Sequence, residues 1–229
     1  MKMTKNRKKA IADLDRMKEY SLEDAVKMVK ELKFTKFDES VDLAMNLGVD
    51  PRHADQNIRV STSLPHGTGK EVKVLVVTQG PKEKEAEDAG ADFVGKSYLE
   101  KIKGGWDDVD KIIATPDMMP ELGKMGKVLG PKGLMPNPKL GSVSENIKEA
   151  VTNAKSGQVE IRNDKDGNIG VSIGKKSFHD DQLLKNFHAI LDALEKEKSN
   201  NTLKGDLIKN TFVTSSMGVS YKVKLGKSI

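Results

Sequence analysis

The spacing of apolar residues changes twice along this chain, and the two changes limit the folds open to it. Near the start, apolar residues from Val41 to Leu47 alternate with polar or small ones, which predicts a strand with one buried face. In the middle, residues 72–77 form an almost unbroken aliphatic run, as expected of a strand covered on both faces. From Val159 the alternation returns. The chain therefore predicts two different sheets, one of them built from both ends.

The first flank predicts one helix and two strands. Ser21 is suited to cap a helix, and Asp24 follows it three residues later. Apolar residues then recur at helical spacing as far as Leu32. Strands are expected over residues 41–47 and 57–64, and the second of these ends at a turn that contains Pro65.

The central segment predicts strands that alternate with helices. Such alternation is typical of parallel βαβ units. The expected strands cover residues 72–77, 91–94 and 111–114, and the expected helices cover residues 81–89, 97–102 and 144–154.

The last flank returns to an antiparallel pattern. Residues 159–162 and 168–173 flank Asp166-Gly167, which is a hairpin signal. An amphipathic helix is expected from Leu183 to Leu194, followed by strands over residues 212–214 and 221–225. We therefore expect an α+β split domain formed by both termini, residues 1–66 and 159–229, with an inserted α/β three-layer, Rossmann-like domain, residues 67–158. The two chain crossings between these domains would form a hinge.

Composition excludes several classes of protein. None of the 229 residues is cysteine, so disulfides and thiolate chemistry are excluded. No apolar run approaches the roughly 20 residues that span a bilayer. The N-terminus lacks the apolar stretch of a secretory signal, so we expect a cytoplasmic protein.

The basic charge of the chain is concentrated in its flanks. The net charge is +5, yet residues 67–158 contain fourteen lysines and fourteen acidic residues. A nucleic acid that binds through charge should therefore contact the flanks. Much of the surplus comes from Lys2, Lys5, Arg7, Lys8, Lys9, Arg16 and Lys18.

One central segment differs from the rest of the chain. Residues 122–144 contain no acidic side chain, but five glycines, three prolines and four lysines. Glycines let a backbone approach a ligand, prolines stiffen the path and lysines attract phosphate. The segment is either a structured connection between two elements or a second RNA contact. The candidates for that contact are Lys124, Lys127, Gly130, Lys132, Gly133 and Lys139.

Three features that suggest catalysis or metal binding fail on inspection. Residues 66–70 (HGTGK) lack the first glycine and the final hydroxyl of a phosphate-binding loop. Residues 170–174 (GVSIG) match a nucleophile elbow in letters but continue a strand. The four histidines do not have the spacing of metal ligands. We therefore expect no catalytic residue, no metal and no cofactor.

A run of hydroxyl-bearing residues separates the last two expected strands. Thr214, Ser215 and Ser216 are followed by Met217 and Gly218. Hydroxyls can reach phosphates and ribose 2′-OH groups, and a glycine permits close backbone approach, so a side chain at position 218 would weaken RNA binding without unfolding the domain. The residues alone leave a second interpretation open, in which the string is an ordinary loop.

Several strings together resemble those of the bacterial large-subunit ribosomal proteins of the L-one family. The resemblance extends from about residue 8 to residue 225. The chain departs from the usual form at Ser216, often threonine, which keeps the hydroxyl, and at Val219, often proline, which would loosen the turn. The matching strings are GKVLGPKGLMPNPKLG (126–141), TSSMG (214–218), KFTKFDESV (33–41), NLGVDPRHADQNIR (46–59) and SLPHGTGK (63–70).

The resemblance implies an RNA-binding surface on the split terminal domain. In the family, the residue at Phe37 packs against the RNA backbone, whereas Phe34 has no such role. The implied RNA-binding residues are Lys36, Phe37, Ser40, Lys165, Ser172, Thr214, Ser215, Ser216, Met217 and Gly218.

The resemblance also implies a function. It is that of a structural constituent of the ribosome, which binds large-subunit rRNA to form the mobile stalk at the tRNA exit site. The implied partners are this rRNA, the exit-site tRNA, whose release as deacylated tRNA the protein assists, and the protein's own operon mRNA, whose translation it represses. The free protein would be a monomer without a membrane partner. Two alternatives are a non-specific RNA chaperone and a nucleotide-binding enzyme, although the latter would need a glycine fingerprint after residue 77, where Gly80 stands alone.

Overall fold

The protein divides into two compact units with separate hydrophobic cores. The computed structural model describes residues 5–12, 15, 18–32, 35–53, 56–106, 108–200 and 206–225. The terminal unit consists of Met1–Gly69 and Val159–Ile229, and the central unit of Lys70–Gln158. Of the positions named above, Lys2, Arg16 and Phe34 lie outside the described residues, as do residues 33, 54 and 55 of the matching strings.

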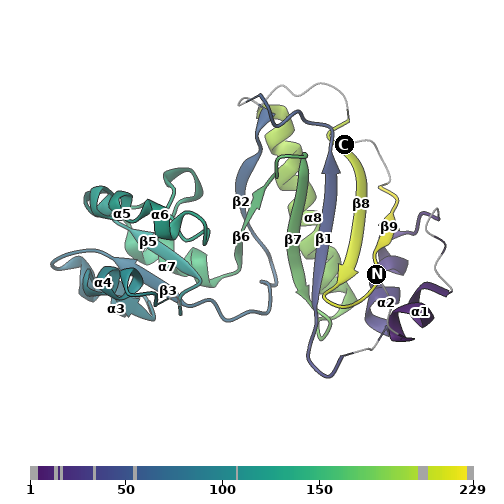
Figure 1. Ribbon diagram of the computed structural model, residues 1–229, viewed down its shortest axis with the longest axis horizontal. Helices are drawn as coiled ribbons and strands as arrows, with labels where there is room; N and C mark the ends of the chain where they lie inside the picture. The colour runs from purple at the N-terminus through teal and green to yellow at the C-terminus, as the bar shows by residue number, and fades with distance from the viewer. Residues whose placement is uncertain are drawn as a thin grey trace. The chain divides into compact units, whose positions relative to one another are not determined.

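A four-stranded antiparallel sheet forms the centre of the terminal unit (Figure 1). Its order is β7-β1-β8-β9, in which β1 (Ser40–Leu47) lies between β7 (Asn168–Lys175) and β8 (Ile208–Ser215). Strand β9 (Tyr221–Val223) pairs with the outer edge of β8. One strand comes from the first part of the chain and three from the last. The predicted antiparallel sheet from both termini is therefore confirmed.

The alternation of residues places one face of this sheet in the core. The four apolar residues from Val41 to Leu47 are buried, and helices α2 (Leu22–Glu31) and α8 (Asp180–Asn200) cover them. Helix α2 begins at the predicted cap, because the backbone N–H of Asp24 donates to Ser21 Oγ at 3.1 Å. Helix α1 (Lys5–Ala12) contributes partly buried apolar residues to the same core.

The expected hairpin between the segments around Asp166-Gly167 is corrected by the structure. The turn forms, but β6 (Gln158–Arg162) pairs with β2 (Arg59–Ser63) in a separate two-stranded sheet. Only one bridge, between Asn163 and Ile169, links this segment to β7. The Asn163 side chain accepts the N–H of Ile58 at 2.8 Å, so it holds β6 beside β2.

A three-stranded parallel sheet forms the centre of the central unit, as predicted. Strand β3 (Val74–Val77) lies between β4 (Phe93–Val94) and β5 (Lys111–Ala114), and all four of its residues are buried. Its side chains alternate between two apolar clusters, one shared with α3 and α7 and the other with α4, α5 and α6. These helices cover Lys82–Asp88 (α3), Ser97–Lys103 (α4), Met119–Lys124 (α5), Gly126–Leu129 (α6) and Ile147–Lys155 (α7), with short 3-10 turns at Pro116–Met118 and Pro138–Leu140.

Both ends of the central unit contact the start of β5. Lys70 Nζ lies 2.5 Å from the Asp110 carboxylate, and the N–H of Lys73 donates to the same carboxylate at 3.1 Å. At the other end of the unit, Lys111 Nζ donates to the carbonyl of Gln158 at 2.6 Å. Because Asp110 and Lys111 are consecutive, the central unit begins and ends at the same place.

The Asp92 carboxylate of the central unit has a pKa below its ordinary value. Burial alone would raise the pKa of Asp92, but the N–H of Val74 and the ammonium of Lys155 outweigh this effect. The pKa of Asp92 therefore lies below its ordinary value of 3.8. This carboxylate is the one charged group that links the start of β3 to the end of α7 among the ion pairs of the described residues.

Candidate nucleic-acid interface

The outer face of the terminal unit's sheet carries mainly small and polar side chains, with Phe212 as a large apolar exception. Inward residues of β1 are apolar, so the alternate residues face outward and pair across three strands. In one of the resulting rows, Asn46 Nδ2 donates to Asn168 Oδ1 at 2.8 Å. Hydroxyls and amides suit contacts with phosphates and sugars. The rows are Ser172–Asp42–Thr214, Gly170–Ala44–Phe212 and Asn168–Asn46–Asn210.

Most of the expected RNA-binding residues meet at the end of the sheet where β1 begins and β8 ends, here called the Ser40 end. The N–H of Ser216 donates to the carbonyl of Ser40, and the N–H of Ser40 donates to Ser216 Oγ, both at 3.1 Å. Phe37 is 59% exposed and Met217 is 64% exposed. Lys36, which precedes Phe37 in the sequence, is exposed as well. Large apolar side chains in such exposed positions indicate a contact surface.

The hydroxyl turn between β8 and β9 has internal roles that its sequence did not predict. Ser215 is 3% exposed, and its hydroxyl has no hydrogen-bond partner among the described residues. A Cβ added at Gly218 would lie 2.3 Å from Ser215 Oγ. The structure therefore explains Gly218 by the packing of Ser215, without any need for close approach of RNA.

Two other residues of this turn make contacts within the protein. Thr214 Oγ1 donates to the carbonyl oxygens of Ser215, at 3.2 Å, and Val219, at 3.4 Å. The Val219 side chain is 6% exposed and belongs to the core of the terminal unit. This valine stands where proline is often found, and its burial packs the turn against the core. That valine loosens the turn relative to proline stays a prediction. Ser216 and Met217 are thus the residues of the turn that are exposed.

A buried carboxylate beneath the turn was missed by the sequence analysis. Glu39 is 1% exposed, and its carboxylate accepts the N–H of Met217 at 2.9 Å and pairs with Lys176. Lys175 Nζ donates to Ser40 Oγ at 2.9 Å, so the last residue of β7 and the lysine that follows it both contact this region. The alternation of buried and outward residues in this strand could have predicted the burial of Glu39, because Glu39 precedes the buried Val41 by two residues and therefore faces the core.

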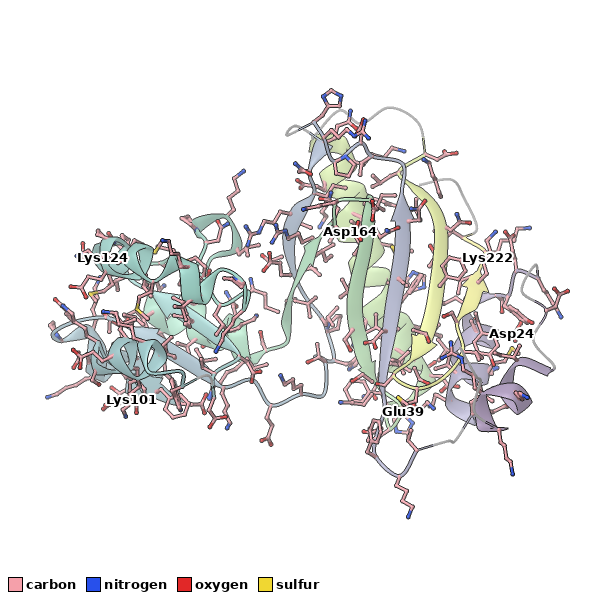
Figure 2. All side chains as sticks on the ribbon, in the orientation of Figure 1. Asp24, Glu39, Lys101, Lys124, Asp164 and Lys222 are labelled. Carbon is pink, nitrogen blue, oxygen red and sulfur yellow. The ribbon has the colours of Figure 1, made fainter. Side chains whose placement is uncertain are left out.

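Lys165 lies apart from the Ser40 end, whereas Ser172 is in the same row as Thr214 and lies beside that end. Ser172 lies within β7, where its hydroxyl donates weakly to the carbonyl of Val41 at 3.4 Å. Lys165 lies in the turn between β6 and β7, and Figure 2 shows its neighbour Asp164 and Glu39 at opposite ends of the sheet. The expected residues therefore form one cluster with an extension along the sheet.

The turn that contains Lys165 borders a basic groove. Its lining includes Arg52, Arg59, Arg162 and Lys165, and the Arg59 guanidinium pairs with Glu160 at 2.8 Å. The N–H of Asn168 holds the pKa of Asp164 below its ordinary value against the opposing effect of desolvation, and the N–H of Asp166 adds to the lowering. The groove thus combines several cations with one stable anion.

The glycine-, proline- and lysine-rich segment of the central unit is structured. Leu122, Met125 and Leu129 are buried in the core, while Lys124, Lys127, Lys132 and Lys139 are exposed (Figure 2 labels Lys124). Gly133 has a φ of 71°, which favours glycine. A Cβ at Gly130 would lie 2.6 Å from the carbonyl of Gly126. The backbone conformation at Gly133 and the close contact at Gly130 therefore explain why these two positions are glycine. The four exposed lysines are the side chains of this segment that could contact a partner.

The described residues hold no group of acids and histidines that could bind a metal ion. The GVSIG string lies inside β7, so Ser172 has no strand–turn–helix around it. No helix in the described ranges is long and apolar enough to cross a membrane. The fold and the surface define a mixed α/β protein whose exposed apolar, hydroxyl and cationic groups suit recognition of a nucleic acid.

Comparison with known proteins gives the family. The model of the ribosomal protein L1p/L10e family matches residues 29–219, so the chain belongs to that family. The chain is 69% identical over 209 residues to the large ribosomal subunit protein uL1 of Pelagibacter ubique (strain HTCC1062), an alignment that covers 91% of each chain. The resemblance inferred from the motifs is thereby confirmed. The chain is a ribosomal protein and not an enzyme, which removes the nucleotide-binding alternative.

Proposed function

We propose that the protein is a structural constituent of the large ribosomal subunit, where its terminal unit binds rRNA and forms the mobile stalk at the tRNA exit site. The observation that supports this most strongly is the Ser40 end, where Phe37 and Met217 are exposed beside Lys36 and Ser216. Apolar and aromatic side chains stack on bases and sugars, and lysines and hydroxyls contact phosphates. The sequence relationship to a large-subunit protein supports the same assignment.

The RNA-binding unit is, in this proposal, a split α+β domain of residues 1–66 and 159–229. The α/β domain of residues 67–158 is inserted in it and is three-layered and Rossmann-like. The outer face of the terminal sheet, with Ser172 and Thr214 in one row, extends the contact from the Ser40 end toward Lys165. The exposed lysines of the central unit meet a second RNA element.

Three partners follow from this assignment. They are the large-subunit rRNA, the exit-site tRNA, whose release as deacylated tRNA the moving stalk assists, and the mRNA of the protein's own operon. The mRNA is bound by the same surface when it folds like the rRNA site, and its translation is then repressed. The free protein is a monomer.

Binding to a stalk fragment of large-subunit rRNA tests the proposal, with a length-matched scrambled RNA as control at about 0.15 M salt. Specific recognition predicts tight binding to the stalk fragment and weak binding to the control. If the protein neutralises about five phosphates, log K falls with log salt at a slope of roughly −4. Equal affinity for both RNAs would instead support the non-specific RNA chaperone.

A further inference from the structure

The exposed turn at the Ser40 end is held by the first residue of β1, Ser40, and by Glu39, which precedes it. Three hydrogen bonds join them, two between Ser40 and Ser216 and one from the N–H of Met217 to Glu39 Oε1 at 2.9 Å. The last of these is the only one made by a buried side chain. The position of Met217 therefore depends on where the Glu39 carboxylate lies.

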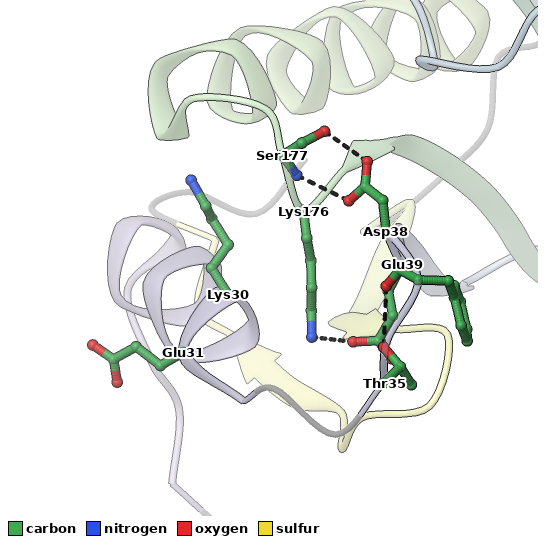
Figure 3. A pocket seen from close by; sticks show the side chains of 8 residues that line it. Lys30, Glu31, Thr35, Asp38, Glu39, Lys176 and Ser177 are labelled. Carbon is green, nitrogen blue, oxygen red and sulfur yellow. Dashed lines mark hydrogen bonds and ion pairs between the residues drawn. The ribbon is translucent and has the colours of Figure 1, made fainter.

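The Glu39 carboxylate is fixed from its other side by Lys176. Figure 3 shows the Lys176 side chain running to this carboxylate, and Oε2 of Glu39 accepts from Lys176 Nζ. The same ammonium donates to the carbonyl of Leu32 at 2.5 Å, and the N–H of Lys176 donates to the carbonyl of Glu39 at 2.9 Å. One ion pair thus joins the ends of α2 and β7 to the turn after β8.

Stability alone gives a poor reason for this ion pair. The Glu39 side chain is 1% exposed and that of Lys176 is 12% exposed, so both charges lose most of their hydration. Apolar residues of similar volume often replace such pairs with no loss of stability. The pair differs from an apolar contact in that it supplies a directed acceptor to the backbone of Met217.

Glu39 is also two residues from Phe37, the second exposed apolar residue, and both residues line the same pocket. Glu39 therefore connects the two exposed residues: it is joined to Phe37 through the chain and to Met217 through the hydrogen bond from the Met217 N–H. A surface whose parts are already in place loses less conformational entropy when a partner binds.

We propose that Glu39, neutralised by Lys176, is a positioning residue for RNA recognition, which holds Met217 in register with Phe37 before the RNA arrives. This inference rests on the proposed function, because it assumes that Phe37 and Met217 contact RNA. Glu39 itself does not touch the RNA. Its contribution to affinity acts through the hydrogen bond to the Met217 N–H.

Two double variants separate this role from a contribution to folding. Glu39→Leu with Lys176→Met removes the acceptor but keeps the volume, so the protein should unfold at the same denaturant concentration or a higher one. Its affinity for the stalk rRNA fragment should fall about tenfold. Glu39→Gln with Lys176→Met keeps an acceptor for Met217 and should bind within about twofold of the wild type. Asp92→Asn with Lys155→Met removes a pair of the same charges from the central unit and should leave the affinity unchanged.

A mutant cycle with Met217→Ala tests the route of the effect. If Glu39 acts through Met217, the double change Glu39→Leu with Lys176→Met should cost less than about twofold in the Met217→Ala background. A full tenfold loss in that background would overturn the proposal, as would wild-type affinity in a folded protein that carries the same double change alone. If Met217→Ala itself binds normally, the proposed function of this surface fails, which is a separate result.

Hydrogen exchange in the wild-type protein covers the case in which the leucine variant does not fold. The proposal requires the Met217 amide to exchange much more slowly than the same amide in an unstructured chain, although Met217 itself lies in an exposed turn. The protein with Glu39→Gln and Lys176→Met should keep this protection. Exchange of the wild-type Met217 amide at the rate of an unstructured chain would overturn the proposal.

Discussion

Replacing Gly218 by alanine should destabilise the terminal unit, because the added methyl group meets a buried hydroxyl. The new Cβ would lie 2.3 Å from Ser215 Oγ, whereas non-bonded atoms normally keep about 3.5 Å. One group must therefore move by roughly 1 Å in a site where Ser215 is 3% exposed. Crowding of this kind costs about 1–3 kcal/mol. Gly218 is not among the glycines with positive φ, so alanine adds no backbone strain there.

Removing the hydroxyl should cancel most of this loss. After Ser215→Ala the nearest atom to the new methyl group is the Cβ of residue 215, at 3.6 Å, which is an ordinary contact. Ser215→Ala alone should cost little, since the hydroxyl has no partner among the described residues. The double variant should lie within about 0.5 kcal/mol of Ser215→Ala, so the two changes couple by roughly 1–2 kcal/mol.

Equilibrium urea unfolding measures these differences, provided that the probe reports the terminal unit. The chain has one tryptophan, Trp106, and it lies in the central unit. Near-ultraviolet circular dichroism of the edge-to-face pair Tyr20–Tyr221, whose ring centroids are 5.6 Å apart, is the better signal. A double variant as unstable as Gly218→Ala would refute the steric argument.

The same proteins decide why residue 218 is glycine. If the reason is internal, the stable double variant should bind the stalk rRNA fragment within about twofold of the wild type. If it folds normally and loses affinity, the RNA approaches Gly218 closely, as the sequence analysis expected. The structure favours the first outcome because Ser215 already occupies the space.

Three further predictions concern other surfaces. Met217→Ala should weaken binding to the stalk fragment by roughly 1–3 kcal/mol in a titration, with no change in the urea midpoint, since the side chain is 64% exposed. Because the pKa of Asp92 is lowered by folding, its carboxylate stabilises the protein above pH 3.8 and loses this effect as the pH falls through its lower folded-state value. Asp92→Asn should therefore lower the urea midpoint at neutral pH and converge with the wild type in acid. Lys124→Gln with Lys127→Gln should reduce by about 2 the salt slope for the second RNA element that the central unit meets, with tRNA as the probe, and leave binding of the stalk rRNA fragment unchanged.

Hydrophobic spacing predicted both sheets because burial on one face or on two faces leaves different patterns. The alternation in β1 and the unbroken run in β3 correspond to the antiparallel and parallel sheets of the structure. The same reasoning failed for the segment after Val159. Asp166-Gly167 specifies a reversal of the chain, but strand pairing depends on distant groups. Here the Asn163 side chain bonds to Ile58, 105 residues earlier in the sequence.

The candidate site was predicted in part. Exposed Phe37 and Met217 were named from the motifs and lie at the same sheet end. Local sequence could not separate the hydroxyls that face outward from Ser215, which faces the core. Nor could it show that Lys165 lies at the far end of the sheet. Glu39 was within reach, because its spacing from Val41 gives its direction, but its partner Lys176 is 137 residues away.

The common location of the two ends of the central unit has a consequence for how the protein is made. Strand β1 leaves the ribosome early, yet its partners β7 and β8 follow only after residue 168, more than 100 residues later. Synthesis at about 5–20 residues per second leaves β1 without partners for several seconds or longer. All residues of the central unit are complete before β7 appears, so this unit can fold first. Once folded, it holds residues 70, 110, 111 and 158 together, so the two ends of the central unit lie close to each other. Folding of the central unit therefore lowers the loss of chain entropy when β1 pairs with β7 and β8. The terminal sheet then closes a loop much shorter than the sequence separation suggests.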